Sequence, residues 1–231
     1  GWDAVPIVDI FQQEFAVPVA VQNDANACAL AEWMMGAGQG TKNMVFLTFG
    51  TGMGAGLIIN GQLYSGTNDL AGEVGHIRLA EDGPVGFGKA GSFEGFCSGG
   101  GIARLAASII AEKLQAGETV AFCPTPDQIQ HVTARDVFEA AIAGDPFAEQ
   151  IIHISADYLG RGLSVIIDIL NPECIVIGSI YSRNEKLLKP LIEKVLEREA
   201  IPAANKVCRI VTAALGDDIG DYAALSVALN N

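Results

Sequence analysis

The sequence predicts an α/β protein, and three observations lead to this prediction. Short apolar runs with strand character alternate along the chain with longer runs in which apolar residues recur at helical spacing. Half of the 231 residues are hydrophobic and only 18% are charged, which is typical of a globular chain. Four glycines crowd into the seven residues 50–56, between two strand candidates. We therefore expect a sheet flanked by helices, with a glycine-rich turn between two of its strands.

In the first part of the chain, each element is predicted from its apolar pattern and the signals at its ends. In order, they are a helix over 6–15, a short buried strand over 17–21 (VPVAV), a helix from Asp24 to Gly36, a strand over 44–49, and a hairpin of 57–59 with 62–64. Asp24 can cap the helix that follows it, and Gly36 with Gly38 can end that helix. Asn60 and Gly61 form a two-residue turn signal that is typical of hairpins.

The second part of the chain is predicted to hold longer helices and two more buried strands. In order, they are a helix over 94–115 that CSGGGIA weakens at its start, a helix capped by Thr133, a helix over 147–170 interrupted by Gly160 and Gly162, a strand in ECIVIGS, a helix over 185–199, a strand in CRIVTAAL, and a closing helix over 221–229. This alternation of strands and helices is what an α/β sheet requires.

The composition argues against several classes of partner. With 27 acidic residues against 14 Lys and Arg, the formal charge is −13, which disfavours the broad basic surface that binds nucleic acid. A small anionic ligand stays compatible with this charge, because backbone N–H groups can hold one. No apolar run reaches the roughly 18 residues of a membrane span, and five scattered cysteines indicate reduced thiols. We expect a cytoplasmic protein with no membrane segment and no nucleic-acid partner.

The glycine cluster has two interpretations. Gly50, Gly52, Gly54 and Gly56 recur at every second position, so neither the G-x-G-x-x-G nor the G-x-x-x-x-G-K-[ST] spacing occurs. A glycine turn with Thr51 between two strands resembles the phosphate-binding hairpin of actin-like ATPases, where turn N–H groups face phosphate oxygens and a Cβ would block the approach. The alternative is a bulged hairpin that needs positive φ at several positions. The stretch alone leaves both open.

Three further groups of polar residues favour a ligand site. In VQNDANA, Asp24 stands where a strand gives way to a helix, which is where α/β proteins bind ligands, although capping alone would also explain it. In GTNDLAGEVGH, Glu73 and His76 stand among small residues and suit a ligand rich in hydroxyl groups. In GSFEGFCSGGG, Glu94 leads into a helix. Together with the glycine turn, these residues indicate a bound hydroxyl compound next to a phosphate.

These residues together resemble the ROK family of sugar kinases and sugar-responsive repressors. The matching segments follow the family order and are VPVAVQNDANACALAE, FGTGMGAGLIINGQLYSG, AGEVGH, GSFEGFCSGGGIA, NPECIVIGS and LGDDIGDYAAL. The resemblance implies a ribonuclease H-like, actin-type ATPase fold with two lobes that close on ATP and a hexose. It further implies Mg²⁺ as a cofactor and a homodimeric assembly.

The resemblance also implies a role for each matching residue. Asp24 matches the catalytic base, which accepts the proton of the attacking sugar hydroxyl. The residues that match sugar ligands are Asn23, Glu73, His76 and Glu94, those that match the phosphate turn are Gly50, Thr51, Gly52 and Gly54, and those that match the adenosine site are Gly178 and Ser179. A weaker match places Gly216 to Asp218 near that site. Phosphoryl transfer mainly needs alignment and charge stabilisation, with one carboxylate at the nucleophile.

The chain departs from the family at its zinc site. Family members bind zinc with the histidine of AGEVGH and three cysteines, whereas Val85, Phe87 and Ser92 stand at those cysteine positions here. A lone imidazole cannot hold structural zinc, which takes four N or S ligands. We therefore expect no zinc, with local packing by Phe87 and Phe93 in its place.

A second departure lies at the front of the chain, where the family's D-x-G-G-T phosphate loop has no counterpart before the glycine turn. The expected organisation is a remnant of an N-terminal lobe at 1–24, a C-terminal lobe at 25–217 that carries the phosphate, sugar and adenosine sites, and a closing helix at 218–231 that packs on the N-terminal lobe. Such a fragment is expected to have weak or no kinase activity, while the parent protein would be the enzyme.

Two function classes follow from the resemblance, and a third depends on the parent protein. The first is an ATP-dependent hexose kinase, which Asp24 and the unbroken glycine turn favour because a sensor needs no contact with a γ-phosphate. The second is the sugar-sensing domain of a transcriptional repressor, whose DNA-binding segment would precede this chain. A catalytically inactive binding module would follow if the parent also lacked the first phosphate loop.

Overall fold

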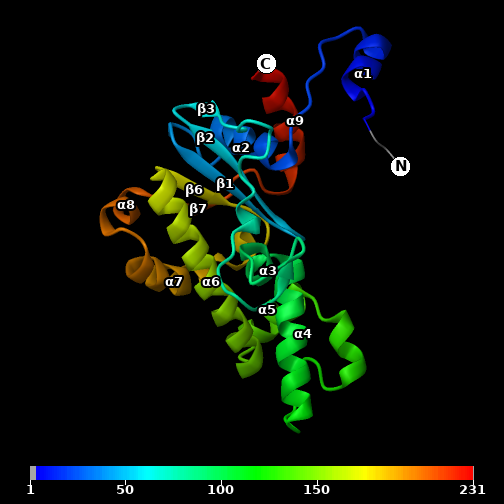
Figure 1. Ribbon diagram of the computed structural model, residues 1–231, viewed down its shortest axis with the longest axis vertical. Helices are drawn as coiled ribbons and strands as arrows, with labels where there is room; N and C mark the ends of the chain where they lie inside the picture. Colours follow the sequence, from blue (N-terminus) through cyan, green and yellow to red (C-terminus); the bar gives the residue numbers. More distant parts are fainter. Residues whose placement is uncertain (1–3, 231) are drawn as a thin grey trace.

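A five-stranded mixed sheet lies at the centre of the structure, with its strands in the order β3-β2-β1-β6-β7 (Figure 1). The structure is a computed structural model and describes residues 4–230. The strands are β1 Met44–Phe49, β2 Met53–Ile59, β3 Gln62–Leu63, β6 Cys174–Ile177 and β7 Arg209–Thr212. β1 pairs antiparallel with β2 and parallel with β6. A separate two-stranded sheet joins β4 (Val85–Gly86) to β5 (Lys89–Ala90).

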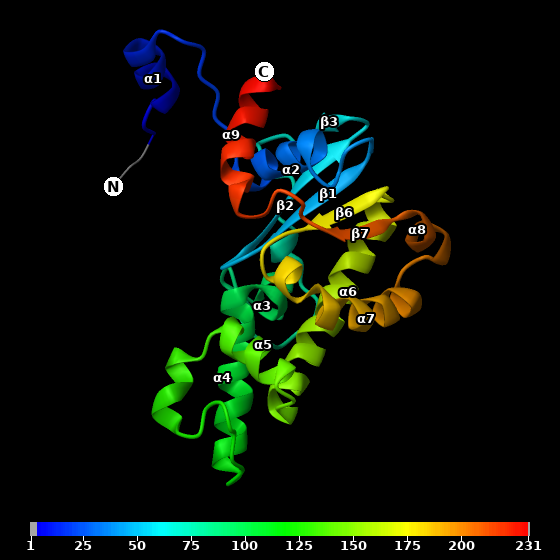
Figure 2. The same ribbon diagram turned by 180° about the vertical axis from the view of Figure 1, so that it is seen from behind.

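Helices cover both faces of the central sheet (Figures 1 and 2). The α-helices are α1 Ile7–Phe15, α2 Asp24–Met35, α3 Phe93–Cys97, α4 Gly99–Gln115, α5 Ala134–Ile142, α6 Pro146–Leu170, α7 Ile180–Glu199, α8 Pro202–Val207 and α9 Ile219–Leu229. Short 3₁₀ turns are η1 Val74–His76, η2 Pro126–His131 and η3 Gly216–Asp218. No helix within residues 4–230 combines the length and the apolar character that crossing a membrane requires.

The two faces of the sheet follow the two-residue period of a strand. Met44 and Phe46 of β1 point to one face, where they are buried with Leu30 of α2. Val45 and Leu47 point to the opposite face, where they join the large core formed with α3 to α7. Both faces of β1 are therefore buried, which explains why 44–49 is a continuous apolar run rather than an alternating one.

Helix α2 lies unusually close to β2 because Gly56 has no side chain. A Cβ on Gly56 would lie 2.4 Å from Ala29 Cβ and 2.5 Å from the carbonyl oxygen of Ala25. Gly54 faces the same helix two residues earlier, where a Cβ would lie 3.7 Å from Ala25 Cβ. The first two turns of α2 are thus seated on the glycine-rich strand.

A buried carboxylate fixes the segment between β7 and α9 against the end of α2. Glu32 is fully buried and accepts three backbone hydrogen bonds, from the N–H groups of Ala37, Ala214 and Leu215 at 2.8, 3.1 and 3.0 Å. A buried carboxylate is costly unless it is hydrogen-bonded, and these three donors offset that cost. Helix α9 then packs on α2 through Ala223.

Two glycines in α6 do not interrupt the helix as predicted. A Cβ on Gly160 would lie 2.5 Å from Val195 Cβ of α7, and one on Gly162 would lie 2.3 Å from the ring of Phe93 in α3. α6 runs unbroken through both positions. The glycines therefore serve close helix packing rather than a break.

Three other local predictions are wrong. Residues 17–21 form no strand, and Val17 and Val21 are 52% and 63% exposed, because no neighbouring strand within residues 4–230 pairs with them. The cap of α2 is Asn23, and Asp24 is the first helical residue. The predicted helix 94–115 is two helices that meet at Ser98.

Helix α1 lies apart from the rest of the molecule in both ribbon views (Figures 1 and 2). None of its residues is buried, although Phe11 and Phe15 pack on each other with ring centroids 5.8 Å apart. Its position therefore does not affect the packing around the sheet.

The contact between α2 and β2 gives a stability prediction. In the full-length protein, Gly56→Ala should lower the free energy of unfolding by about 1–3 kcal/mol or more, because the new methyl overlaps α2 backbone and Ala29. Urea denaturation followed by circular dichroism measures this loss.

The matched control is Gly220→Ala in α9, where no heavy atom lies within 4 Å of the new Cβ. That substitution should leave stability unchanged or raise it by up to about 1 kcal/mol through helix propensity. Equal midpoints for Gly56→Ala and the unmodified protein would contradict the packing interpretation.

Candidate functional site

The glycine turn between β1 and β2 is held by hydrogen bonds to its carbonyl groups. Gly50 N–H donates to the carbonyl of Gly52 at 3.2 Å within the turn. The carbonyls of Gly50 and Thr51 accept from the N–H groups of Gly99 and Gly100, at 2.7 and 3.4 Å. The turn is thereby fastened to the N-terminus of α4.

The N–H groups at the tip of the turn are free. Within residues 4–230, no protein acceptor takes the N–H of Thr51 or of Gly52. Adjacent unpaired N–H groups form a concave site of positive potential that suits an anionic oxygen. The carbonyls of the turn point to the protein, so its remaining hydrogen-bonding capacity is that of a donor.

Positive φ does not explain the glycines of the turn. Gly50, Gly52, Gly54 and Gly56 all lie outside the left-handed region, so the bulged-hairpin alternative is wrong. A Cβ on Gly50 or Gly54 would meet no protein atom closer than 3.8 or 3.6 Å. Gly56 is required by α2, whereas a Cβ on Gly50 or Gly54 would make only ordinary van der Waals contacts with the protein.

Beside the turn lies a cavity of about 540 Å³, which we call the carboxylate cavity. It brings together every residue predicted as a base or sugar ligand: Asn23, Asp24, Glu73, His76 and Glu94. Thr51, Gly52 and Gly54 of the turn form another part of its wall. Residues from four separate segments therefore converge on one hollow.

The N-terminus of α2 supplies two of these side chains. Asn23 Oδ1 caps the helix by accepting from the N–H groups of Ala25 and Asn26, at 3.0 and 3.2 Å. Asp24 Oδ1 accepts from Ala25 N–H at 2.8 Å, and its other oxygen has no partner within the described residues. The capping duty falls on Asn23, so the Asp24 carboxylate keeps an oxygen for a ligand.

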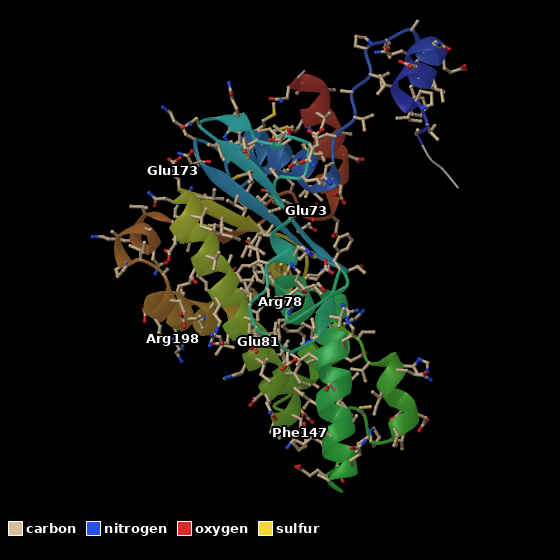
Figure 3. The ribbon with its side chains drawn as sticks, viewed as in Figure 1. Glu73, Arg78, Glu81, Phe147, Glu173 and Arg198 are labelled. Carbon is tan, nitrogen blue, oxygen red and sulfur yellow. The ribbon has the colours of Figure 1, made fainter. Side chains whose placement is uncertain are left out.

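Glu73, His76 and Glu94 line the carboxylate cavity from two other segments of the chain. Glu73 and His76 are exposed at the ends of η1, and Figure 3 shows Glu73 beside the sheet. The His76 ring meets Phe87 edge-on, with centroids 5.9 Å apart. Glu94 Oε2 accepts from Met53 N–H at 3.0 Å. With Asp24 and Asp69, the cavity thus holds four carboxylates, each with oxygens available to hydroxyl donors.

The Cys28 thiol of α2 is not a candidate nucleophile. Burial, followed by the charges of Asp24 and Glu32, raises the pKa of the Cys28 thiol to about 11. Because the thiolate is the reactive form, Cys28 stays unreactive at neutral pH.

On the far side of the turn lies a second cavity of about 940 Å³, the helix cavity, between α4, α5 and α7. Gly50, Thr51 and Ser179 line it, so Thr51 belongs to both cavities. Gly178 lines a third cavity of about 520 Å³, together with Ser179, Gly216 and Asp217. The predicted adenosine residues therefore lie where the helix cavity and this third cavity meet.

Several lining residues had not been singled out from the sequence. In the carboxylate cavity they include Thr48 and Asp69. In the helix cavity they include Gly99, Gly100, Arg135 and Arg183. Asp69 lies in the same GTNDLAGEVGH segment as Glu73, and the triple glycine at 99–101 was a visible signal. The two arginines belong to helix surfaces with no distinguishing pattern.

The segment at the family's zinc position does not fit the metal. Val85 and Phe87 are 47% and 79% exposed, and no cluster of three His, Cys, Asp or Glu residues within 4–230 could hold an ion. Ser92 is buried, accepts from Gly95 N–H at 3.1 Å and donates to the carbonyl of Gly86 at 3.2 Å. Phe87 is too exposed to act as the predicted packing residue, whereas Phe93 is fully buried.

Arg78 also ties this segment together. Its Nη1 donates to the carbonyls of Glu81 and Ala90, at 3.2 and 2.9 Å, and Figure 3 shows Arg78 and Glu81 side by side. The segment is thus held by hydrogen bonds from Arg78 and Ser92.

Comparison with known proteins places these observations in a family context. The sequence model of the ROK family matches residues 1–231. A glucokinase of Halalkalibacterium halodurans is 40% identical over 223 residues, which cover 95% of this chain and 66% of that protein. A xylose repressor of Caldicellulosiruptor bescii is 32% identical over 202 residues, which cover 87% of this chain and 49% of the repressor.

A solved structure agrees with the sequence comparison. The crystal structure of a ROK family glucokinase from Streptomyces griseus, in complex with glucose and AMPPNP, matches with a TM-score of 0.79 at 31% identity. The match covers 99% of this chain and 73% of that chain. The predicted ribonuclease H-like, actin-type ATPase fold is confirmed. The chain spans about two thirds of the length of the curated glucokinases that it matches.

The segment around Ser92 gives a metal prediction. Elemental analysis of the purified full-length protein should find well below one zinc atom per chain, because the segment offers one imidazole and no thiolate. One zinc per chain that disappears in His76→Ala would contradict this.

Proposed function

Since the chain belongs to the ROK family, we propose that it acts in a sugar kinase that transfers the γ-phosphate of ATP to a hexose hydroxyl. The observation that carries the proposal is a turn with two unpaired N–H groups between a cavity of carboxylates and a second, larger cavity. A hydroxyl acceptor in the first cavity and a triphosphate in the second would meet at this turn. Glucose or a close relative is the proposed acceptor.

Asp24 is the proposed catalytic base. Its unpaired carboxylate oxygen would accept the proton of the sugar hydroxyl while that hydroxyl oxygen forms a bond to the γ-phosphorus. The bond between the γ-phosphorus and the bridging oxygen breaks, and its electron pair leaves with ADP. Asn23, Glu73, His76 and Glu94 would orient the sugar by hydrogen bonds to its other hydroxyl groups.

The glycine turn is proposed to hold the end of the triphosphate. The N–H groups of Thr51 and Gly52 would donate to phosphate oxygens. Gly50 lines the helix cavity and Gly54 lines the carboxylate cavity, and neither presents a side chain that would stand between a ligand and the backbone. Ser179 and Gly178 would lie against the nucleoside. ATP would supply the phosphoryl group, and a Mg²⁺ ion bound with it would neutralise phosphate charge.

A sugar-sensing domain of a repressor is the second candidate, and the xylose repressor relative supports it. That function would use the carboxylate cavity and leave the helix cavity without nucleotide. The free Asp24 oxygen and the open glycine turn favour the kinase. For either function we propose a cytoplasmic homodimer, with no nucleic-acid contact through this chain.

A coupled-ADP assay of the full-length protein against a sugar panel tests the proposal, with Asp24→Asn as the decisive variant. Asparagine keeps the size of Asp24 but cannot accept the proton, so kcat should fall by about 10²–10⁴-fold. The sugar Kd, measured by calorimetry, should stay within a few-fold. A variant that remains fast would exclude Asp24 as the base, and a parent inactive on every sugar would favour the repressor.

Gly50→Ala tests the turn separately from folding. The new methyl meets no protein atom closer than 3.8 Å, so the unfolding free energy should change by less than about 1 kcal/mol. The KM for ATP should nevertheless rise by about tenfold or more, the loss expected when a phosphate hydrogen bond is obstructed. An unchanged KM for ATP would show that phosphate binds elsewhere, and an unchanged sugar Kd provides the internal control.

A further inference from the structure

The junction of α3 and α4, within CSGGGIA, has no part in the transfer chemistry described above. Ser98 N–H donates to the carbonyl of Glu94 at 2.9 Å, and Ser98 Oγ accepts from Gly101 N–H at 3.0 Å. Ser98 is therefore both the C-cap of α3 and the N-cap of α4. This fixes the direction of α3 relative to α4.

Gly101 allows the two helices to touch at this junction. A Cβ on Gly101 would lie 2.2 Å from the carbonyl oxygen of Gly95 and 2.4 Å from that of Glu94. These distances are too short for any side chain, so the backbone of α3 rests directly on the first turn of α4. The position of Glu94 is consequently set by the start of α4.

The same first turn of α4 holds the glycine turn from one side. The Gly99 and Gly100 N–H groups are used by the carbonyls of Gly50 and Thr51. The N-terminus of α4 thus has no N–H at these positions for an anion, and it acts on a ligand only through the turn. One edge of the turn is therefore rigidly attached to α4.

Glu94 holds the turn from the other side. Its Oε2 accepts from the N–H of Met53, the residue that directly follows Gly52. A Cβ on Gly52 would lie 3.1 Å from the same oxygen, so the carboxylate lies against the backbone of the turn. Within residues 4–230 the other Glu94 oxygen has no protein partner, and the side chain lines the carboxylate cavity.

We propose that Glu94 is a positioning residue that couples the two cavities. This inference rests on the proposed kinase function. A sugar hydroxyl that donates to the free oxygen of Glu94 holds the carboxylate in one rotamer, and the other oxygen then holds Met53 N–H and orients the tip of the turn. The donors of Thr51 and Gly52 are in this way ordered for phosphate once sugar is bound, and by linkage nucleotide binding tightens the sugar site equally.

Glu73 is the natural comparison for Glu94. Both carboxylates line the carboxylate cavity, but the Glu73 side chain makes no hydrogen bond to the turn. Replacing either should weaken sugar binding, whereas only Glu94 transmits that binding to the nucleotide. A purely structural or purely sugar-binding role for Glu94 would not produce this difference.

The test uses calorimetry on the full-length protein with glucose as the probe. The Kd for glucose is measured once without and once with a saturating non-hydrolysable ATP analogue. The ratio of the two Kd values is the coupling factor. The unmodified protein should give a factor of about 5 or more, within the usual range for linked sites. Glu94→Asp keeps the charge but shortens the reach, and its factor should fall to within about twofold of 1. Glu73→Asp should raise the sugar Kd and keep the original factor.

A second variant covers the case in which Glu94→Asp does not fold. Glu94→Gln keeps the length of the side chain but offers a weaker, neutral acceptor. Its coupling factor should lie between those of the unmodified protein and Glu94→Asp. An unchanged factor in Glu94→Asp, or in Glu94→Gln when the first variant is unfolded, overturns the coupling while leaving the kinase proposal intact. An unmodified protein that binds both ligands with a coupling factor near 1 also overturns the coupling and leaves the kinase proposal intact. A parent that binds neither ligand overturns the proposed function, and the coupling with it.

Discussion

The position of α2 against β2 is the contact on which the rest of the site depends. It exists because Gly56 offers no Cβ, so the backbone at Ala25 and Ala29 can enter the space that a side chain would fill. Asp24 immediately precedes Ala25, and its location is therefore determined by this contact rather than by the loop before it. A shift of α2 by the width of one methyl group would move the Asp24 carboxylate relative to the glycine turn. Such small misplacements are costly for a reaction that depends on alignment.

The turn itself works because its hydrogen-bonding groups are divided between protein and ligand. The carbonyls of Gly50 and Thr51 are satisfied by α4, while the N–H groups of Thr51 and Gly52 remain unpaired. Because the protein occupies these carbonyls, the turn offers donors to a ligand, and positioned donors of this kind stabilise developing negative charge. Because Thr51 borders both the carboxylate cavity and the helix cavity, this small segment is the place where acceptor and donor would meet.

Elsewhere in the fold, side-chain hydrogen bonds hold loops in place. Ser92 and Arg78 hold the segment that contains Val85 and Phe87 by donating to the carbonyls of Gly86 and Ala90. Glu32 performs a similar function at the far end of α2, where its buried carboxylate collects the N–H groups of Ala214 and Leu215 and so fixes the wall beside Gly216. Both devices hold loops whose residues border the candidate site.

The sequence by itself determined the Asn60-Gly61 hairpin and the Thr133 cap, because these depend on neighbours along the chain. A continuous apolar run identified the strand 44–49, and polar motifs identified the residues that meet in the carboxylate cavity. Strand formation at 17–21 could not be decided in this way, since a strand needs a partner that local sequence does not specify. Only the tertiary structure decided that Gly56 is required by α2 while Gly50 and Gly54 line the two cavities, and that Glu94 accepts from the N–H of Met53, 41 positions away. The physical reason is that residues of one type, such as two glycines or two glutamates, take different roles according to the groups that pack beside them. That packing is determined by contacts between segments distant in the sequence.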